Sequence, residues 1–254
     1  MNPATLRALE RLHVRAWPAT ETASIDGWLW RWSGGGSQRA NSVSTVSFAG
    51  GDVEAALDRV EARYRAKGVP AQFHTYDLTE PAGLPALLTA RGYRAGEATT
   101  TMAATSGAAT SGAATSGPGA PPVDVEMRTD PCPEWLDVYL GAITESRRAV
   151  NREISRRVPD PRAFFSVRRA GRVISTALGV VDGGHAVAEC VATRADARGQ
   201  RGADAAMRAL LVWAASLGAH TAGLQVVSGN APAVALYRRL GFAPVCENRF
   251  WVKR

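Results

Sequence analysis

The spacing of hydrophobic residues predicts alternating helices and strands in the first hundred residues. A helical spacing predicts a helix over residues 5–15, a second helix capped by Asp52 and closed by Gly68, and a third over 84–91. Apolar–polar alternation predicts strands over 24–32, 40–48, 71–76 and 98–103.

The same alternation returns after residue 122. Strands are predicted over 123–128, 163–169, 172–181, 185–193, 221–227 and 243–252. Helices are predicted over 134–143, 150–158, 203–217 and 231–240. Mixed helices and hairpins of this kind predict an α/β fold of the α+β type, built on a mixed sheet.

A run of small and polar residues separates the two stretches. The sequence AATSG occurs three times in succession over 103–117 and is followed by PGAPP. Such residues bury too little surface to offset the entropy of ordering, which predicts a flexible linker over 103–122. We therefore expect a domain at 1–102 and a second domain at 123–254.

The two halves share a pattern of helix-ending glycines. Gly68 and Gly218 are 150 residues apart, and Gly92 and Gly241 are 149 apart. Agreement of order and distance indicates an internal duplication. The first half has Leu88 and Pro81 where the second has Tyr237 and Asn230. We therefore expect the chemistry in the second half, with the first as a scaffold or substrate wall.

The composition excludes some classes and suggests an anionic partner. The net charge of +7 comes almost entirely from arginine, because Lys67 and Lys253 are the only lysines. Three widely spaced cysteines favour reduced thiols in a cytoplasmic protein over a disulfide framework. The sequence shows neither a signal peptide nor an apolar run long enough to span a membrane.

Residues 198–203 precede the predicted helix over 203–217 and form a candidate phosphate site. A loop entering a helix presents unpaired N–H groups and the positive end of the helix dipole, to which Arg198 and Arg201 add charge. The alternative is a solvated turn with two surface arginines.

Three further side chains have both a structural and a chemical interpretation. Asn230 is either a helix N-cap or a ligand-binding amide. Tyr237 is either a core aromatic residue or a proton donor. Glu189 lies in an apolar strand, either facing solvent or beside a cleft with a raised pKa.

Together these residues resemble the GNAT superfamily of N-acetyltransferases. The family pattern Asn-x-x-Ala-x-x-Leu-Tyr-x-x-Leu-Gly-Phe is matched in full by Asn230, Ala233, Leu236, Tyr237, Leu240, Gly241 and Phe242. The family also opens a helix with Arg/Gln-x-x-Gly-x-Gly/Ala. Here Arg201 stands at the central Gly of that motif and Ala203 fits its last position. The resemblance covers about 123–254, and the first half resembles the degenerate leading copy of two-domain GNAT proteins.

The resemblance implies acetyl-CoA as the acyl donor and no metal. The pyrophosphate would bind the backbone amides of Arg198, Gly199, Gln200, Arg201, Gly202 and Ala203. The pantetheine would lie along Val191, Ala192 and Thr193 like an added strand, with a hydrogen bond from Asn230. Backbone N–H groups near Cys190 and Val191 would stabilise the oxyanion, and Tyr237 would protonate the thiolate. Glu189 is the candidate base for the amine, with a water relay as the alternative.

The implied activity is transfer of the acetyl group to a primary amine within a ternary complex. A small molecule, a peptide N-terminus and a protein lysine all remain open as acceptors. The rival interpretation is a non-catalytic acyl-CoA-binding regulator of the same fold. We do not expect a nucleic-acid-binding module, because basic and aromatic residues do not interleave and no C₂H₂ or helix-turn-helix pattern is present.

Overall fold

The computed structural model describes residues 1–105 and 124–253. The helices are α1 (Pro3–Ala16), α2 (Val53–Ala66), α3 (Leu84–Ala90), α4 (Pro133–Gly141), α5 (Glu145–Arg156), α6 (Gly202–Ser216) and α7 (Ala231–Arg239), with short 3₁₀ turns η1 (Arg39–Asn41) and η3 (Ala195–Ala197). The strands of the first half are β1 (Glu21–Ile25), β2 (Trp28–Trp32), β3 (Val43–Ser44), β4 (Gln72–Tyr76), β5 (Tyr93–Ala95) and β6 (Thr99–Thr105). Those of the second half are β7 (Asp124–Arg128), β8 (Arg162–Arg169), β9 (Arg172–Asp182), β10 (His185–Thr193), β11 (Thr221–Val227) and β12 (Ala243–Lys253).

Within the described residues, the strands form one continuous mixed sheet. Its order is β1-β2-β3-β4-β12-β6-β11-β10-β9-β8-β7, and β5 pairs with β12 at the edge of this path. Each half has a run of antiparallel strands that ends in one parallel pair, β3 with β4 and β10 with β11. This repetition agrees with the internal duplication that the sequence predicts, and the first copy is the smaller of the two.

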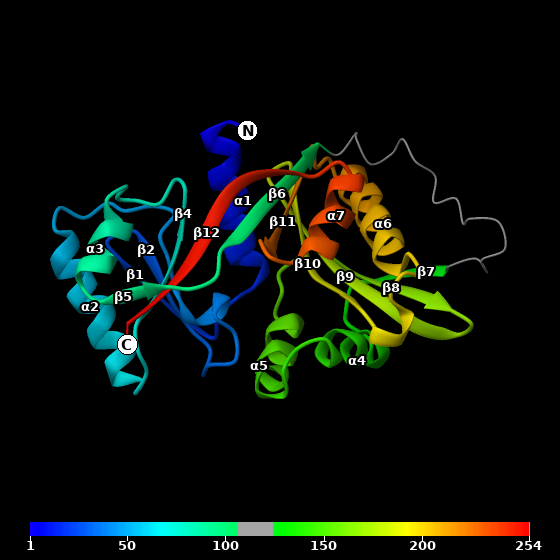
Figure 1. Cartoon of the computed structure of the whole chain (residues 1–254), viewed down its shortest axis with the longest axis horizontal. Coiled ribbons are helices and arrows are strands. Elements are labelled where there is room, and N and C mark those ends of the chain that lie inside the picture. The colour runs from blue at the N-terminus through cyan, green and yellow to red at the C-terminus, as the bar shows by residue number, and fades with distance from the viewer. Residues whose placement is uncertain (106–123, 254) are drawn as a thin grey trace.

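The last strands of the two halves are exchanged. Strand β6 comes from the first half but pairs with β11 of the second, whereas β12 comes from the second half and pairs with β4 of the first. The two strands also pair with each other and run side by side across the middle of the molecule (Figure 1). The sequence boundary between the halves is therefore not a boundary in the sheet.

Helices cover the sheet unevenly. On the second half, α6 and α7 pack on one face, while α4, α5 and α1 pack on the other. On the first half, α2 and α3 cover one face through a core that includes Trp28 and Trp30 of β2. Helix α1 lies between the halves (Figure 1). It begins at the side chain of Asn2, which accepts a hydrogen bond from the Thr5 amide at 2.8 Å.

Most predicted elements are present, but the predictions between residues 24 and 48 were wrong in two places. The predicted strand 24–32 is a hairpin, because Asp26 and Gly27 both have positive φ and form its turn. The predicted strand 40–48 is reduced to the two residues of β3. There the Asn41 side chain accepts hydrogen bonds from the amides of Ser33 and Gly35, which ties this segment down as a loop.

The predicted linker 103–122 falls almost entirely outside the described residues. Its first three residues belong to β6, so the sheet continues past the predicted domain end at residue 102. Strand β5 was not predicted at all. Its three residues are too few to show an alternation pattern.

Gly179 of β9 sets how closely α6 approaches the sheet. A Cβ at this position would lie 2.7 Å from Cζ3 of Trp213 and 3.0 Å from Cγ of Leu210, both on α6. The absent side chain is therefore what allows the Trp213 ring to lie on the strand. We expect Gly179→Ala to lower the free energy of unfolding by about 1–3 kcal/mol through overpacking.

Urea unfolding measures this effect, and Gly83→Ala is the matched control. A Cβ at Gly83 meets nothing within 4 Å, so that variant should stay within about 0.5 kcal/mol of the native chain. Equal stability of the two variants would show that Trp213 moves aside without cost.

Candidate functional site

A cavity of about 440 Å³ opens where strands β10 and β11 separate. Register pairs join these strands only from His185 to Ala188 on β10. Beyond that point the following residues of both strands line the cavity. Its walls come from β10, β11 and α7 of the second half, and from the segments around Arg39 and Glu97 of the first. The first half therefore forms part of the cavity wall.

A β-bulge shapes the floor of this cavity. On the side facing β9, the register shifts between Glu189 and Ala192, so Cys190 and Val191 lie opposite a single residue. Cys190 has φ of 52°, and its carbonyl accepts a hydrogen bond from the Thr176 hydroxyl at 3.2 Å. A bulge takes backbone N–H groups out of the ladder, which makes them available to a ligand.

Glu189 is a buried carboxylate held by two basic side chains of the first half. Its Oε1 lies 2.9 Å from Nδ1 of His13 on α1, and its Oε2 accepts a hydrogen bond from Nη1 of Arg39 at 2.5 Å. Burial alone would raise the pKa of Glu189, but the Arg39 charge and the His13 contact outweigh it and bring the pKa down to about 2.

This environment disfavours Glu189 as the base that deprotonates an amine. A carboxyl group with a pKa of about 2 is far weaker as a base than an amine with a pKa near that of lysine, about 10.4. Proton transfer between them would be uphill by roughly 11 kcal/mol. The carboxylate therefore serves to bind Arg39 and His13. The sequence shows only that Glu189 lies in an apolar strand, and it does not show these partners.

Tyr237 lies at the opposite wall of the cavity, on α7. Only 7% of the residue is exposed, and its ring packs edge-on against Phe242. Burial, with a smaller effect from the Glu189 charge, raises the pKa of Tyr237 to about 12. The phenol therefore stays protonated at neutral pH and keeps a proton to donate. It is at once a core residue and a cavity residue, so the two interpretations of its position are compatible.

Asn230 begins α7 and also lines the cavity. Its Oδ1 accepts a hydrogen bond from the Ala233 amide at 3.3 Å, which makes it the N-cap of the helix. Capping uses only the carbonyl oxygen, so the exposed side-chain NH₂ is left for a ligand. Val191 lines the cavity as well, while Ala192 and Thr193 continue β10 beyond it.

The loop 198–203 leads into α6 as the sequence predicts, and its conformation explains the motif. Arg201 is the residue before the helix and has φ of 60°, in the region that favours glycine. The next residue, Gly202, lies so close to β9 that a Cβ would meet the Ser175 hydroxyl oxygen. That hydroxyl lies 2.7 Å from the hydroxyl of Thr193, which connects the end of β10 to the start of α6.

The remaining loop residues lie outside the cavity wall. Gln200 accepts hydrogen bonds from Arg169 through its side-chain and main-chain oxygens, and Gly199 has φ of 76°. Arg198 is exposed, and Ala203 is the second residue of α6. The site residues predicted from sequence thus form two groups, one in the cavity and one at the N-terminus of α6.

Sequence reasoning missed three residues from the first half. His13 and Arg39 contact Glu189, and Glu97 follows β5 and lines the cavity mouth. His13 and Arg39 lie 176 and 150 residues from Glu189 along the chain, so no spacing rule connects them. Polar residues of the site are therefore not confined to the second half.

Cys190 does not have the environment of a nucleophile. Burial raises the pKa of its thiol, and the neighbouring Glu189 charge adds to that effect. A thiol in such surroundings stays protonated. Within residues 1–105 and 124–253, no cluster of His, Cys, Asp and Glu is arranged to hold a metal ion. The helices of these residues are too short or too polar for a membrane span.

The ion pairs of Glu189 give a pH-dependent contribution to stability. Its folded pKa of about 2 lies below the ordinary value of 4.5, so the contribution is complete above about pH 4.5 and is lost as the pH falls towards 2. Its size is roughly 3 kcal/mol. We expect Glu189→Gln to lower the free energy of unfolding by about that amount at pH 7.

Urea unfolding at pH 7 and pH 3 checks this, because the difference between native and variant chains should shrink by roughly half at pH 3. Glu153→Gln, which removes an exposed carboxylate paired with Arg156, is the control and should change stability by less than about 1 kcal/mol. A Glu189→Gln difference that is the same at both pH values would show that the carboxylate is not ionised in the folded chain.

Comparisons with known proteins agree with this architecture. Residues 3–251 match the family described as "Probable histone acetyltransferase Rv0428c C-terminal". The chain is 29% identical over 255 residues to the "Uncharacterized N-acetyltransferase YobR" of Bacillus subtilis (strain 168), a match that covers 98% of this chain and 99% of the relative.

Two solved structures show the same fold at low sequence identity. A GCN5-related N-acetyltransferase from Kribbella flavida superposes with a TM-score of 0.74 at 18% identity, covering 100% of this chain and 96% of that one. A tandem GNAT protein from the clavulanic acid biosynthesis pathway superposes with a TM-score of 0.65 at 13% identity, covering 99% and 95%. The chain therefore belongs to the family described as probable histone acetyltransferase Rv0428c C-terminal, and its fold is that of a two-domain GNAT protein.

Proposed function

We propose that this chain transfers an acetyl group from acetyl-CoA to a primary amine, by direct attack within a ternary complex. The observation that carries the proposal is the separation of β10 from β11 after Ala188, which leaves a strand edge open inside a cavity that also holds Asn230 and Tyr237. An open edge of this kind pairs with an extended amide chain, and pantetheine is such a chain.

The donor would be held at both ends of that open edge. The pantetheine arm would pair with β10 along Val191, Ala192 and Thr193, with the NH₂ of Asn230 on its other side. The pyrophosphate would bind the first amides of α6 and the loop 198–203, since helix N-termini attract anions. The hydroxyl contact between Thr193 and Ser175, close to Gly202, supports this arrangement because it brings the end of β10 near the start of α6.

Acyl transfer forms an N–C bond and breaks the C–S bond, so negative charge develops first on the carbonyl oxygen and then on sulfur. The backbone amides of the bulge at Cys190 and Val191 would donate to the oxyanion. The Tyr237 phenol would donate a hydrogen bond to the leaving sulfur. The Tyr237 phenol, with a pKa of about 12, is a weaker acid than a thiol, whose pKa is about 8.5. Its proton would therefore pass fully to the sulfur only as the amine nitrogen releases its own proton.

The proton of the amine would leave through water rather than to Glu189. The low pKa of that carboxylate supports a different role, in which its charge fixes Arg39 and His13 across the cavity floor. Glu189 would thus position the wall of the acceptor site, and the acceptor would react as the fraction of amine that is already neutral.

The acceptor would enter at the side of the cavity formed by the first half. Glu97 lies at that mouth with its side chain exposed, and the described residues show no ion pair to it. An unpaired carboxylate there suits a cationic ammonium group. The family description refers to histone acetylation, so a lysine-bearing peptide belongs in the test panel beside small amines and peptide N-termini.

The experiment that tests this function is thiol release from acetyl-CoA in the presence of an amine panel, together with calorimetric titration of acetyl-CoA. No binding at millimolar donor would refute the proposal. Binding without thiol release for any amine would favour the alternative, a regulator that binds acyl-CoA without turnover.

Replacement of Tyr237 by Phe removes the proposed donor to sulfur. We expect the rate of thiol release to fall by about 10- to 100-fold, with acetyl-CoA affinity nearly unchanged, because the hydroxyl acts mainly after the C–S bond begins to break. Tyr76→Phe is the matched control, since the Tyr76 hydroxyl is buried in a separate cluster and has no hydrogen-bond partner among the described residues. Equal losses of rate and donor affinity in Tyr237→Phe would make Tyr237 a packing residue.

Replacement of Glu97 by Gln tests the proposed acceptor entrance. We expect KM for a cationic amine to rise by roughly two- to fivefold, while KM for acetyl-CoA stays constant, because an exposed charge contributes less than about 1 kcal/mol. Steady-state kinetics of thiol release measure both values, with Glu153→Gln as the control. An unchanged amine KM would place the acceptor elsewhere.

A further inference from the structure

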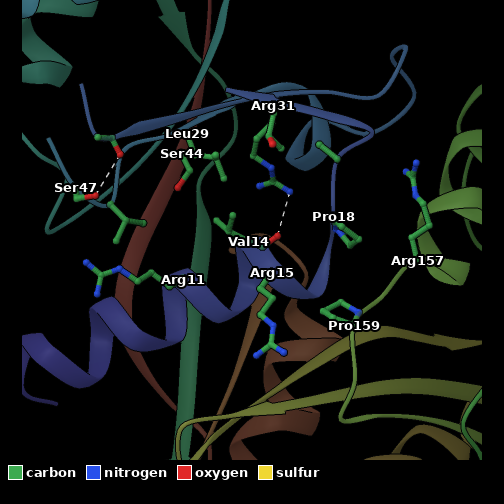
Figure 2. Close-up of a pocket in the computed structure, with 14 residues that line it drawn as sticks. Arg11, Val14, Arg15, Pro18, Leu29, Arg31, Ser44, Ser47, Arg157 and Pro159 are labelled. Carbon is green, nitrogen blue, oxygen red and sulfur yellow. Dashed lines mark hydrogen bonds between the residues drawn. The ribbon is translucent and has the colours of Figure 1, made fainter. Parts of the chain in front are cut away.

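A second cavity of about 500 Å³ lies on the first half, between α1 and the strands β2 and β3 (Figure 2). None of its lining residues belongs to the site between β10 and β11. Its volume falls within the range of small-molecule sites. Neither the GNAT motif residues nor the proposed acyl transfer uses it.

The cavity exists because the first half has fewer helices than the second. On the second half, two helices, α4 and α5, cover the sheet face on the side of α1. The corresponding face of the first half carries the alternate residues of β2, Leu29 and Arg31, and α1 alone packs near it. The end of α5 contributes only Arg157 and Pro159 at the rim, so the space between stays open (Figure 2).

The lining combines an apolar wall with positive charge. Apolar side chains come from α1 and its C-terminal turn, from β2 and from the segment after β3, among them Val14, Pro18, Leu29 and Val46. Four arginines complete it, namely Arg11, Arg15, Arg31 and Arg157, and no lining residue is acidic. A surface of this composition fits a molecule with an apolar body and an anionic group.

Arg31 is the buried member of these four arginines. It is 4% exposed, and its Nη2 donates to the main-chain oxygens of Val14 and Trp17. Figure 2 shows its guanidinium pointing from β2 towards Val14 on α1. Both bonds use one nitrogen, and within the described residues no carboxylate lies within ion-pair distance of Arg31. Burial, and then repulsion from Arg39, lower the pKa of Arg31 to about 9.

The other arginines of the cavity are partly compensated. Arg15 pairs with Asp182 at 2.6 Å, and Arg157 donates to the Thr20 hydroxyl at 3.0 Å. The hydrogen bond from Arg7 is the main reason that the pKa of Glu80 is lowered, and the Arg11 charge adds a smaller effect. Arg31 contacts the negative end of the α1 dipole, through carbonyls at the last turn of the helix. The Glu189 charge acts on Arg31 only from a distance, because that carboxylate pairs with Arg39. A buried cation with no carboxylate in contact is unfavourable, and a ligand anion would relieve it.

We propose that this cavity is a second ligand site, which binds a small molecule with an apolar body and one anionic group, a carboxylate or a phosphate, placed against the Arg31 guanidinium. The apolar body lies along Leu29 and Val46, where it is removed from water. Arg11 and Arg157 stand at the opening and attract the anion during entry.

A chain of contacts links this site to the cavity at β10. Arg31 donates to the Trp17 carbonyl, the Trp17 ring lies 4.8 Å from the Arg39 guanidinium carbon, and Arg39 pairs with Glu189. A ligand anion that draws Arg31 towards itself competes with the carbonyl of Trp17. The second site and the contacts of Glu189 are thus connected through Trp17 and Arg39.

Isothermal titration of the full chain with sodium octanoate, n-octyl phosphate and uncharged octanol tests the proposal without any turnover. We expect saturable one-to-one binding of at least one anion, with octanol bound roughly 10- to 100-fold more weakly, because a charge-assisted hydrogen bond is lost. Binding of octanoate alone assigns a carboxylate ligand, and binding of octyl phosphate alone assigns a phosphate. No saturable binding, or octanol bound as tightly as the anions, overturns the proposal.

Two variants locate the binding. Arg31→Met should weaken the anion by roughly 10- to 100-fold and leave octanol unchanged, whereas the control Arg152→Met, at an exposed arginine of α5, should change neither. Because Arg31 is buried, Leu29→Trp serves as a second variant that fills the cavity and keeps the guanidinium. Thermal unfolding verifies that each variant is folded. Full anion binding in a folded Leu29→Trp chain would place the ligand outside this cavity.

Discussion

The contacts of Glu189 with Arg39 and His13 are the interaction on which the site between the two halves depends. The carboxylate comes from β10, one residue past its last pair with β11, whereas both partners come from the first half. A buried carboxylate is tolerated only when its charge is met by partners of good geometry, so the position of Glu189 requires the first half to be in place. The role of the first half is thus partly electrostatic, beyond that of a scaffold.

The same dependence is seen in the backbone. The exchange of β6 and β12 places the last strand of each half beside strands of the other half. Glu10 of α1 stabilises this arrangement, because its carboxyl group accepts hydrogen bonds from Thr101 on β6 and Gln225 on β11. Gln225 also lines the cavity. Glu10 and His13 are three residues apart on α1 and so lie on the same face of the helix. Through this face α1 joins the two halves, close to where the donor would bind.

Local chemistry made the second half predictable from sequence. Asn230 caps α7 and Tyr237 lies two turns later on the same helix, so one motif sets both positions. The close approach of Gly202 to Ser175 is likewise local, because α6 begins directly against strand β9. The β1–β2 hairpin was missed although Asp26-Gly27 is a turn signal, because the aromatic residues that suggested a strand all follow the turn and β1 has none. Strand exchange and the contacts of Glu189 depend on pairings between distant segments, which periodicity does not encode.

Two arginines near Trp17, Arg39 half-buried and Arg31 buried, show how the reduced first half differs from the second. Arg39 contacts the Trp17 ring and pairs with Glu189, while Arg31 contacts the Trp17 carbonyl at the C-terminal end of α1. Carbonyl dipoles offset part of a buried charge, and among the described residues the remaining guanidinium N–H groups of Arg31 have no acceptor. Because no helix of the described residues covers this face of the first half as α4 and α5 cover the second, an apolar cavity lies beside those N–H groups. The charge of Arg31 favours an anion and the cavity favours an apolar group, so both fit a molecule that carries an anion on an apolar body.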